Sequence, residues 1–362
     1  MSIHLLYVGT YSETIKFASG RVIKGEGRGI HVLALDAKKA TLAEAALPAA
    51  TRNPSFVSFD AARRFVYAVN EIKETGGTAS AFASDPKTGG LTHLNTVATH
   101  GTDPCHLTLD RSGRHLLIAN YSSGHVTVLP VRTDGTLGEA SQVVAHQGSS
   151  VHPVRQTGPH VHHVAVDAAG TRVYATDLGL DRIVAYRFDP THGTLTPDDP
   201  PYSTLPPGAG PRQMLIHPAG PHAYVLNELG SSVTIHAYNQ ASGRLLPGRT
   251  VSTLPQGLSG TNSCAELRIA PSGRFLYASN RGHNSIAIFA ITPDGDLEPK
   301  GHVPTGGAVP RCFDLSPSGD FLIAANQESS NIVLFRVDQA TGAVAPAGSS
   351  IAVGTPVCVR FL

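Results

Sequence analysis

A strand–turn–strand pattern recurs six times along the chain, and this repetition restricts the fold more than any other feature of the sequence. The segment 158–182, GPHVHHVAVDAAGTRVYATDLGLDR, shows it most clearly, because Val164 and Val166 precede a Gly-containing turn and Val173 follows it. Alternating apolar residues on both sides of such a turn predict an antiparallel hairpin. The second strand of each copy ends at Asn or Asp, in the order Asn70, Asn120, Asp177, Asn227, Asn280 and Asn326.

These end points are separated by 50, 57, 50, 53 and 46 residues. A third apolar strand follows the hairpin after a further turn, as in residues 183–188 and 286–291. A repeat of this length with four strands is typical of one blade of a β-propeller. Helical periodicity is scarce, and the 37 glycines and 26 prolines favour many short strands. The expected fold class is therefore all-β.

The two ends of the chain supply one further copy between them. Residues 356–362 provide only a first strand, and the matching second and third strands are residues 5–10 and 30–35. We therefore predict a single domain over residues 1–362, a seven-bladed β-propeller whose ring is closed by pairing of the N- and C-terminal strands in one blade. Truncation of either end is expected to destabilise the whole ring rather than one blade.

Charge and hydropathy exclude several kinds of partner. The formal net charge is +1 and 15% of the residues are charged, which argues against nucleic acid as the main partner. No stretch approaches the roughly 18 apolar residues of a membrane span, and the first residues lack the basic region of a signal peptide. We expect a cytoplasmic protein without a membrane partner. The four cysteines are far apart, so neither a disulfide framework nor a zinc site is indicated.

The repeat also predicts where function lies. In a blade the first strand lies nearest the central channel and pairs antiparallel with the second, so the start of one and the end of the other meet at one mouth of the channel. Titratable side chains occupy these positions in several blades, and we expect a polar funnel formed by His162, Arg212, Glu228, Glu266, Arg281 and Arg311. Residues 12–29 and 146–160 are long loops on the same side, and such loops commonly carry binding residues.

The composition of this funnel favours hydrolysis of an anionic substrate. Three arginines face two glutamates, and a guanidinium group binds phosphate or carboxylate in bidentate geometry. An imidazole beside them can take a proton from water near neutral pH. Structural alternatives stay open: Arg212 and Arg311 can form ion pairs between blades, and Glu228 can pair with Arg281 across the funnel. His160 and His162 can share a strand face as metal ligands, but no third ligand lies at a telling spacing.

Several segments resemble the lactonase family of seven-bladed propellers, which includes the propeller-type 6-phosphogluconolactonases and a fungal carboxy-muconate cyclase. The segments are GPHVHHVAVDAAGTRVYATDLGLDRI, GPRQMLIHPAGPHAYVLNELGSSV, ASNRGHNSIAIFAI and PRCFDLSPSGDFLIAANQESSNI. The resemblance runs from the first strand to the last. It implies hydrolysis of 6-phosphogluconolactone to 6-phosphogluconate in the pentose phosphate pathway. WD-repeat proteins match less well, because the chain contains no Trp.

The resemblance also implies roles for individual residues. A His, a Glu and arginines act in the cyclase branch, and these positions align with the expected catalytic residues His162, Glu228, Arg212 and Arg281. Expected substrate-binding residues are His160, Arg311, Glu266 and His106. In the expected mechanism, arginines hold the phosphate and polarise the ester carbonyl while His162, assisted by Glu228, activates water. No metal or other cofactor is expected, and the expected partner is a small phosphorylated sugar lactone.

Two rival functions remain open from the sequence. The first is another lactone enzyme, either a muconate-type cyclase or a metal-dependent gluconolactonase, and resistance to EDTA would argue against the metal-dependent enzyme. The second is a non-catalytic propeller that binds a protein partner. Such a scaffold is expected to expose aromatic side chains over one face, whereas only 6% of the residues here are aromatic.

Overall fold

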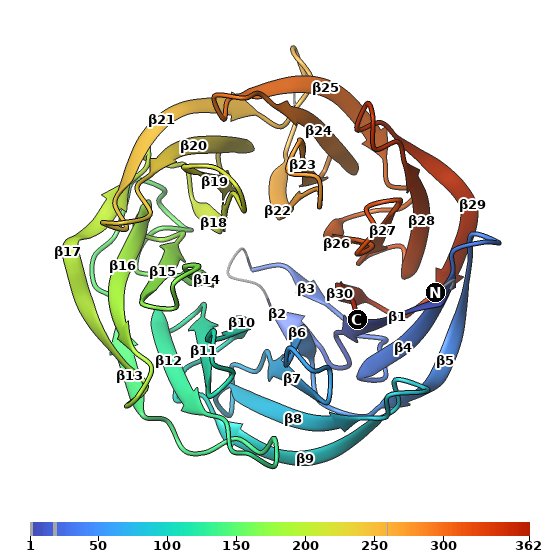
Figure 1. The fold of residues 1–362 in the computed structure, drawn as a ribbon, viewed down its shortest axis with the longest axis horizontal. Helices are drawn as coiled ribbons and strands as arrows, with labels where there is room; N and C mark the ends of the chain where they lie inside the picture. The colour runs from blue at the N-terminus through green and yellow to red at the C-terminus, as the bar shows by residue number, and fades with distance from the viewer. Residues whose placement is uncertain (1–2, 17–19, 259) are drawn as a thin grey trace.

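The computed structural model describes residues 3–16, 20–258 and 260–362, and in these ranges it contains strands and turns but no helix. Seven four-stranded sheets follow one another around a central axis, as Figure 1 shows, and a two-stranded hairpin of β2 (Ile15–Lys16) and β3 (Val22–Ile23) extends over the centre of the ring. The expected all-β class and the seven-bladed propeller are confirmed. The described part of the chain therefore has no helix that could span a bilayer.

Six blades are continuous in the sequence, with strands numbered from the axis outward. The first three are β6 (Pro54–Phe59), β7 (Phe65–Asn70), β8 (Thr78–Ser84) and β9 (Leu91–Ala98); β10 (Pro104–Leu109), β11 (His115–Asn120), β12 (His125–Pro130) and β13 (Gln142–Ala145); β14 (Val161–Val166), β15 (Arg172–Asp177), β16 (Arg182–Asp189) and β17 (Thr194–Thr204). The next three are β18 (Pro211–Ile216), β19 (His222–Asn227), β20 (Ser232–Tyr238) and β21 (Leu245–Ser252); β22 (Ser263–Ile269), β23 (Phe275–Arg281), β24 (Ser285–Ile291) and β25 (Leu297–Pro304); β26 (Pro310–Leu315), β27 (Phe321–Asn326), β28 (Asn331–Val337) and β29 (Val344–Ala352).

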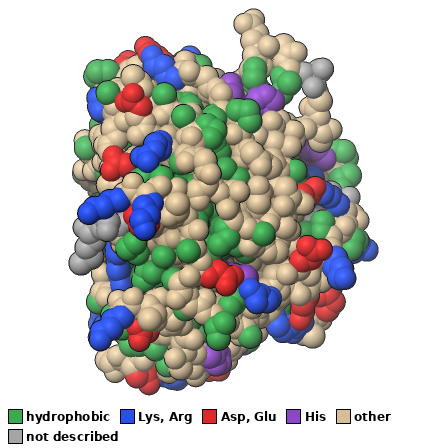
Figure 2. All heavy atoms as spheres, turned by 90° about the vertical axis from the view of Figure 1, so that its right-hand side faces the viewer, with side chains coloured by type: hydrophobic (Ala, Val, Ile, Leu, Met, Phe, Trp, Pro, Cys, Tyr) green, Lys and Arg blue, Asp and Glu red, His purple; other side chains and the backbone are tan. Residues whose placement is uncertain are grey.

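The seventh blade joins the two ends of the chain. Its strands run in the order β30 (Pro356–Phe361), β1 (Ile3–Thr10), β4 (Ile30–Asp36) and β5 (Thr41–Ala49). Antiparallel pairing places Leu6 opposite Phe361 and Val8 opposite Val359, so the last strand is the innermost strand of this blade. The predicted closure of the ring is confirmed. Figure 2 shows this side of the molecule, where side chains of both charges are interspersed over the surface.

The core lies between neighbouring blades. The second strands are buried on both faces, which explains their continuous apolar runs, whereas the outermost strands alternate between exposed and covered residues. Tyrosines on second strands also connect blades, because the hydroxyl groups of Tyr174, Tyr224 and Tyr277 donate hydrogen bonds of 2.7, 2.9 and 3.0 Å to glycine carbonyls in the outer turn of the following blade. In these three blades the next blade supplies the hydrogen-bond partner of the buried tyrosine.

Candidate active site

Every innermost strand carries an irregularity one residue after it begins. The register shifts by one residue between Pro104 and His106 of β10, and the other six innermost strands show a shift at the corresponding place. A β-bulge leaves a residue outside the hydrogen-bond ladder and redirects its side chain. The bulge therefore allows two consecutive residues of the strand to face the channel, where strict alternation would allow only one. The bulge positions include Cys105, His162, Arg212 and Arg311.

These four residues line a cavity of about 700 Å³ at one mouth of the channel. The size falls within the range of sites that bind small molecules. Residues that directly follow second strands complete the wall, among them Glu71, Tyr121, Glu228 and Gln327, together with Arg281 at the end of β23. Six cationic side chains and three carboxylates line the cavity: Lys16, Arg21, Arg155, Arg212, Arg281 and Arg311, and Glu71, Asp103 and Glu228. Five of the six residues predicted for the polar funnel thus line this cavity, Glu266 does not, and the lining has an excess of positive charge.

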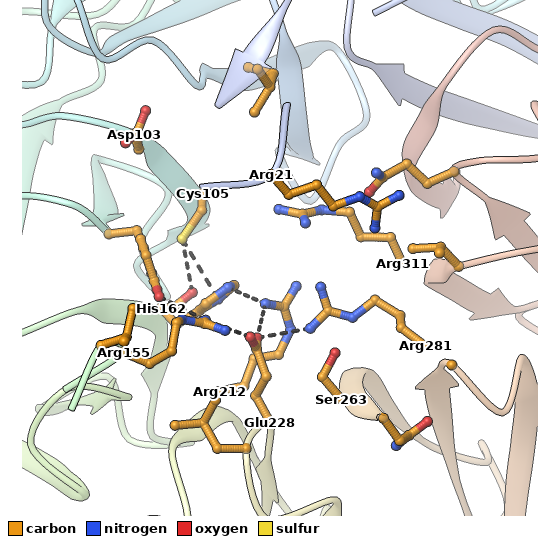
Figure 3. A pocket seen from close by; sticks show the side chains of 18 of the residues that line it. Arg21, Asp103, Cys105, Arg155, His162, Arg212, Glu228, Ser263, Arg281 and Arg311 are labelled. Atoms are coloured by element: carbon orange, nitrogen blue, oxygen red, sulfur yellow. Dashed lines mark hydrogen bonds and ion pairs between the residues drawn. The ribbon is translucent and has the colours of Figure 1, made fainter. Parts of the chain in front are cut away.

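Glu228 is the centre of the charge cluster on one wall of the cavity. Its Oε2 lies 2.7 Å from Nη1 of Arg212 and 3.0 Å from Nη2 of Arg281, and its Oε1 accepts a hydrogen bond of 2.7 Å from Arg155. Figure 3 shows these guanidinium groups converging on the carboxylate. Burial alone would raise the pKa of Glu228, but the three guanidinium groups together hold it well below its usual range. Glu228 is therefore a permanent anion that orders three cations.

His162 is the next group in this cluster. Nη1 of Arg212 donates a hydrogen bond to Nε2 of His162, and Nδ1 lies 3.7 Å from Sγ of Cys105. Burial, and then the charge of Arg212, lower the pKa of His162 well below its usual range. The imidazole is therefore neutral, with its acceptor nitrogen directed at Arg212. Arg212 lies between His162 and Glu228 and bonds to both, so the two expected catalytic groups are linked through its guanidinium group and not by a direct hydrogen bond.

A second charged group lies on another wall. Oε2 of Glu71 accepts a hydrogen bond of 2.9 Å from the hydroxyl group of Tyr11, and Nη2 of Arg311 lies 3.8 Å from the same oxygen. The guanidinium group of Arg311 also lies over the ring of Tyr11, 5.4 Å from its centroid. Burial raises the pKa of Glu71, and the single nearby cation offsets this only in part. Glu71 directly follows a second strand, so the repeat predicts its position at the channel mouth. The repeat does not predict the charges that surround it.

Arg155 belongs to the long loop before β14 and was not among the predicted site residues. The loop is fixed on both sides of it, since the Ser150 hydroxyl donates to Asp181 at 2.6 Å and Nε2 of Gln156 donates to the Leu178 carbonyl at 2.8 Å. These contacts hold Arg155 against Glu228 and 2.9 Å from the hydroxyl group of Tyr121. The excess length of this repeat was the available signal, but it identified the loop and not the residue.

Three of the residues expected to bind substrate lie outside the lining of the cavity. The ring of His160 stacks on the ring of Tyr121, with 4.5 Å between the ring centroids, and Nδ1 of His160 lies 3.0 Å from the Tyr121 carbonyl oxygen. His106 and Glu266 line a much smaller adjoining space of about 30 Å³. There Glu266 forms an ion pair with Arg268. The bulge residues Cys105, His162, Arg212 and Arg311 line both spaces, whereas the residues that follow a bulge, such as His106 and Glu266, line only the narrow one.

Possible metal ligands do not cluster in the described part of the chain. Within residues 3–16, 20–258 and 260–362, no group of three or more His, Cys, Asp or Glu side chains is arranged to hold a metal ion. His160 and His162 do not form a pair of ligands, since their rings contact the face and the edge of Tyr121, respectively. The four cysteines are free and buried.

The fold and the cavity define a seven-bladed propeller with a cationic cavity of a size that suits small molecules. The family described as "Lactonase, 7-bladed beta-propeller" matches residues 5–361, so the chain belongs to this family. A Bacillus subtilis (strain 168) protein named 6-phosphogluconolactonase is 36% identical over 363 residues, covering 100% of this chain and 99% of its own. The expected family is confirmed.

Two solved structures are similar over the whole chain. The periplasmic gluconolactonase of Pseudomonas aeruginosa is 35% identical with a TM-score of 0.92, covering 100% of this chain and 99% of its own. A candidate 6-phosphogluconolactonase from Bacteroides fragilis is 34% identical with a TM-score of 0.91, covering 100% of this chain and 98% of its own. These relatives are named for lactones with and without a phosphate group.

Proposed function

We propose that the protein hydrolyses a sugar lactone, and that its substrate is 6-phosphogluconolactone, which it converts to 6-phosphogluconate. The observation that carries the proposal is the cluster of guanidinium groups around the cavity. Among the described residues, the buried Nε atoms of Arg155 and Arg281 have no hydrogen-bond partner. A buried donor without a partner is costly, and an anionic oxygen of a ligand would satisfy it. Membership of the lactonase family and the names of the relatives support the same conclusion.

The chemistry follows from the charge distribution. In the proposed reaction, Arg212 and Arg281 polarise the ester carbonyl and stabilise the negative charge that develops on its oxygen. Glu228 and the neutral His162 hold Arg212 in place, so the donors are oriented before the substrate binds. The phosphate group contacts Arg155 and the more exposed residues Lys16 and Arg21, while Arg311 lies beside the lactone ring. A net excess of three positive charges in the lining suits a phosphate dianion.

A lactonase assay with freshly prepared 6-phosphogluconolactone tests this proposal, with the spontaneous opening of the ring measured in buffer and subtracted. We expect the wild type to exceed the buffer rate and Arg212→Ala to lose most of that excess. Glucono-1,5-lactone serves as the comparison substrate for the phosphate. Equal kcat/KM values for the two lactones would refute the phosphate contact, and a wild-type rate equal to that of buffer would refute lactone hydrolysis.

Two rival lactone enzymes are separated by the same assay. A metal-dependent gluconolactonase loses activity in EDTA, whereas carbonyl polarisation by guanidinium groups predicts an unchanged rate. A muconate-type cyclase is tested by replacing the substrate with the muconolactone and following ring opening by absorbance. The charge of a phosphate ester prevents free passage through membranes, so the proposed substrate favours the cytoplasmic location expected from the sequence.

A further inference from the structure

The cavity contains two carboxylates at equivalent places in two blades. Glu71 follows Asn70 at the end of β7, and Glu228 follows Asn227 at the end of β19. The two blades are three steps apart in a ring of seven, which is the largest separation that the ring allows. Each carboxylate also lies near an arginine from a bulge of an innermost strand, Arg311 for Glu71 and Arg212 for Glu228. The two pairs differ in origin, because Arg212 and Glu228 belong to one blade, whereas Glu71 and Arg311 come from the two blades on either side of the blade that joins the chain ends.

The surroundings of the two carboxylates differ. Three guanidinium groups contact Glu228 within 3.0 Å, whereas one approaches Glu71 at 3.8 Å and a neutral phenol supplies its hydrogen bond. Only 7% of Glu71 is exposed, so solvent does little to stabilise its charge. Two carboxyl groups whose environments separate their pKa values commonly divide the roles of permanent anion and proton carrier. In this cavity Glu228 is the permanent anion, and Glu71 is the carboxylate suited to carry a proton.

The other titratable groups of the cavity are less suited to take a proton from water near neutral pH. Glu228 keeps its charge because of the three arginines, and Nε2 of His162 already accepts a hydrogen bond from Arg212. Burial raises the pKa of the Cys105 thiol above its usual range and raises that of the Tyr121 phenol to about 12. Asp103 is the remaining carboxylate, and it is more exposed than Glu71 and forms no ion pair with a described arginine, while the Ser122 hydroxyl donates to it. His152 also lines the cavity, but its Nδ1 already accepts hydrogen bonds from the amide groups of Val154 and Arg155.

We propose that Glu71 is the general base of the reaction, and this inference rests on the proposed lactone hydrolysis. As a water oxygen bonds to the carbonyl carbon, a proton of the water passes to the Glu71 carboxylate. The tetrahedral oxyanion faces Arg212 and Arg281. When the bond from the carbonyl carbon to the ring oxygen breaks, Glu71 returns the proton to that oxygen, which becomes a hydroxyl group. The new carboxylic acid then releases a proton to solvent, so one lactone and one water give one hydroxy acid.

Several groups facing Glu71 set the pH at which it can act. Burial is the largest influence and disfavours the carboxylate, as does the charge of Asp103. The guanidinium group of Arg311 and the hydroxyl groups of Ser55 and Tyr11 favour the carboxylate. The Cys105 thiol is a further titratable neighbour. The pKa of Glu71 is therefore raised from the ordinary value of 4.5. A base with a raised pKa predicts that kcat/KM falls as pH decreases through that pKa.

The test is the pH profile of kcat/KM for Glu71→Gln and Tyr11→Phe, measured with 6-phosphogluconolactone. We expect Glu71→Gln to lower kcat by at least about 100-fold with a much smaller change in KM, and to remove the acid limb of the profile. Tyr11→Phe removes a donor that favours the carboxylate, so its acid limb moves to higher pH. Glu71→Ala with added formate regains part of the rate, because formate replaces the missing carboxylate.

The controls separate this inference from a purely structural role. Binding of the product 6-phosphogluconate, measured by calorimetry, shows that each variant is folded with an intact anion site. Asp103→Asn is the matched carboxylate variant, and it should keep the acid limb but move it to lower pH, because the charge of Asp103 disfavours the Glu71 carboxylate. The inference is overturned if Glu71→Gln retains the wild-type profile, or if Asp103→Asn and not Glu71→Gln removes the limb. An inactive wild type would instead overturn the proposed function.

Discussion

Replacing Glu228 with Gln should destabilise the protein, because the carboxylate compensates three buried guanidinium groups. The side chain of Glu228 is 4% exposed, and those of Arg212, Arg281 and Arg155 are 8%, 13% and 20% exposed. The variant keeps the shape of the side chain and removes only its charge. Three cations then remain in one cavity wall without a counter-ion, and their mutual repulsion opposes folding.

The magnitude can be worked from the burial of the cluster. Removing one partner of a buried ion pair costs about 3–5 kcal/mol, since the other charge stays desolvated. A chain of 362 residues has an unfolding entropy of about 0.76 kcal/mol per degree at its midpoint. The expected fall in Tm is therefore about 4–7 °C. Glu298→Gln is the matched control, because Glu298 pairs with Lys300 at 3.1 Å on the surface, and such a pair should change Tm by about 1 °C or less.

Calorimetry at low ionic strength, with and without phosphate, measures this difference. Phosphate should stabilise the variant more than the wild type, because binding to the folded state replaces the missing anion. The folded pKa of Glu228 is lowered, so its stabilising effect is present above its ordinary value of 4.5 and lost as pH falls through the lower folded value. The gap in Tm should therefore persist from pH 8 to pH 5. Equal Tm values for wild type and Glu228→Gln would refute the role of this carboxylate.

Three further outcomes are expected. Arg155→Met should raise KM for 6-phosphogluconolactone by about 10-fold or more with a smaller effect on kcat, since a charge-assisted hydrogen bond is worth about 1.5–3 kcal/mol; an unchanged KM would contradict its place in the cavity. Burial lowers the pKa of His163 to about 3, so wild-type stability should fall as pH decreases below the ordinary value of 6.5. In His163→Gln the urea midpoint should fall less between pH 7.5 and pH 5 than in the wild type. Equal falls in the two proteins would contradict this expectation. Deleting residues 356–362 removes Val357, Val359 and Phe361 from the core, about 5 kcal/mol of burial, so a cooperative melt near the wild-type Tm would disprove closure by β30.

The sequence was sufficient to predict the fold, because a propeller repeats one local pattern. Each hairpin ends at a polar residue and each inner strand is a short apolar run, so the number of copies gives the number of blades. The incomplete copy at residues 356–362 could be completed only by residues 5–10 and 30–35, and these are the strands that pair. Long-range pairing was predictable here because the missing strand had a known partner in every other blade.

The site was predictable only where it follows the repeat. Arg212 and Arg311 occupy equivalent positions in two innermost strands, Glu228 and Arg281 each follow the last Asn of a second-strand repeat, and the structure brings all four to one cavity. Arg155 lies in an insertion that no other blade has, so no equivalent position indicated where it points. The hydrogen bonds that fix its loop are formed by side chains far apart in the sequence, which a repeat does not reveal.

The sequence also did not predict how deep a residue lies in the channel or which charges surround it. Glu266 was predicted in the funnel and His106 among the substrate-binding residues, but both line the narrow adjoining space. Glu71 occupies the same place in its blade as Glu228, yet its single distant guanidinium group makes its chemistry different. Such differences arise from neighbours in adjacent blades, and the order of residues within one blade does not specify them.

The bulges in the seven innermost strands have a consequence for how such a protein can diversify. A residue outside the hydrogen-bond ladder can be replaced without shifting the register of its strand, so the scaffold tolerates changes there that a regular strand would resist. Seven such positions, each from a different blade, form a set that evolution or a protein engineer can vary independently. A new specificity then requires a few substitutions in this ring, while the sheets that hold the ring stay as they are.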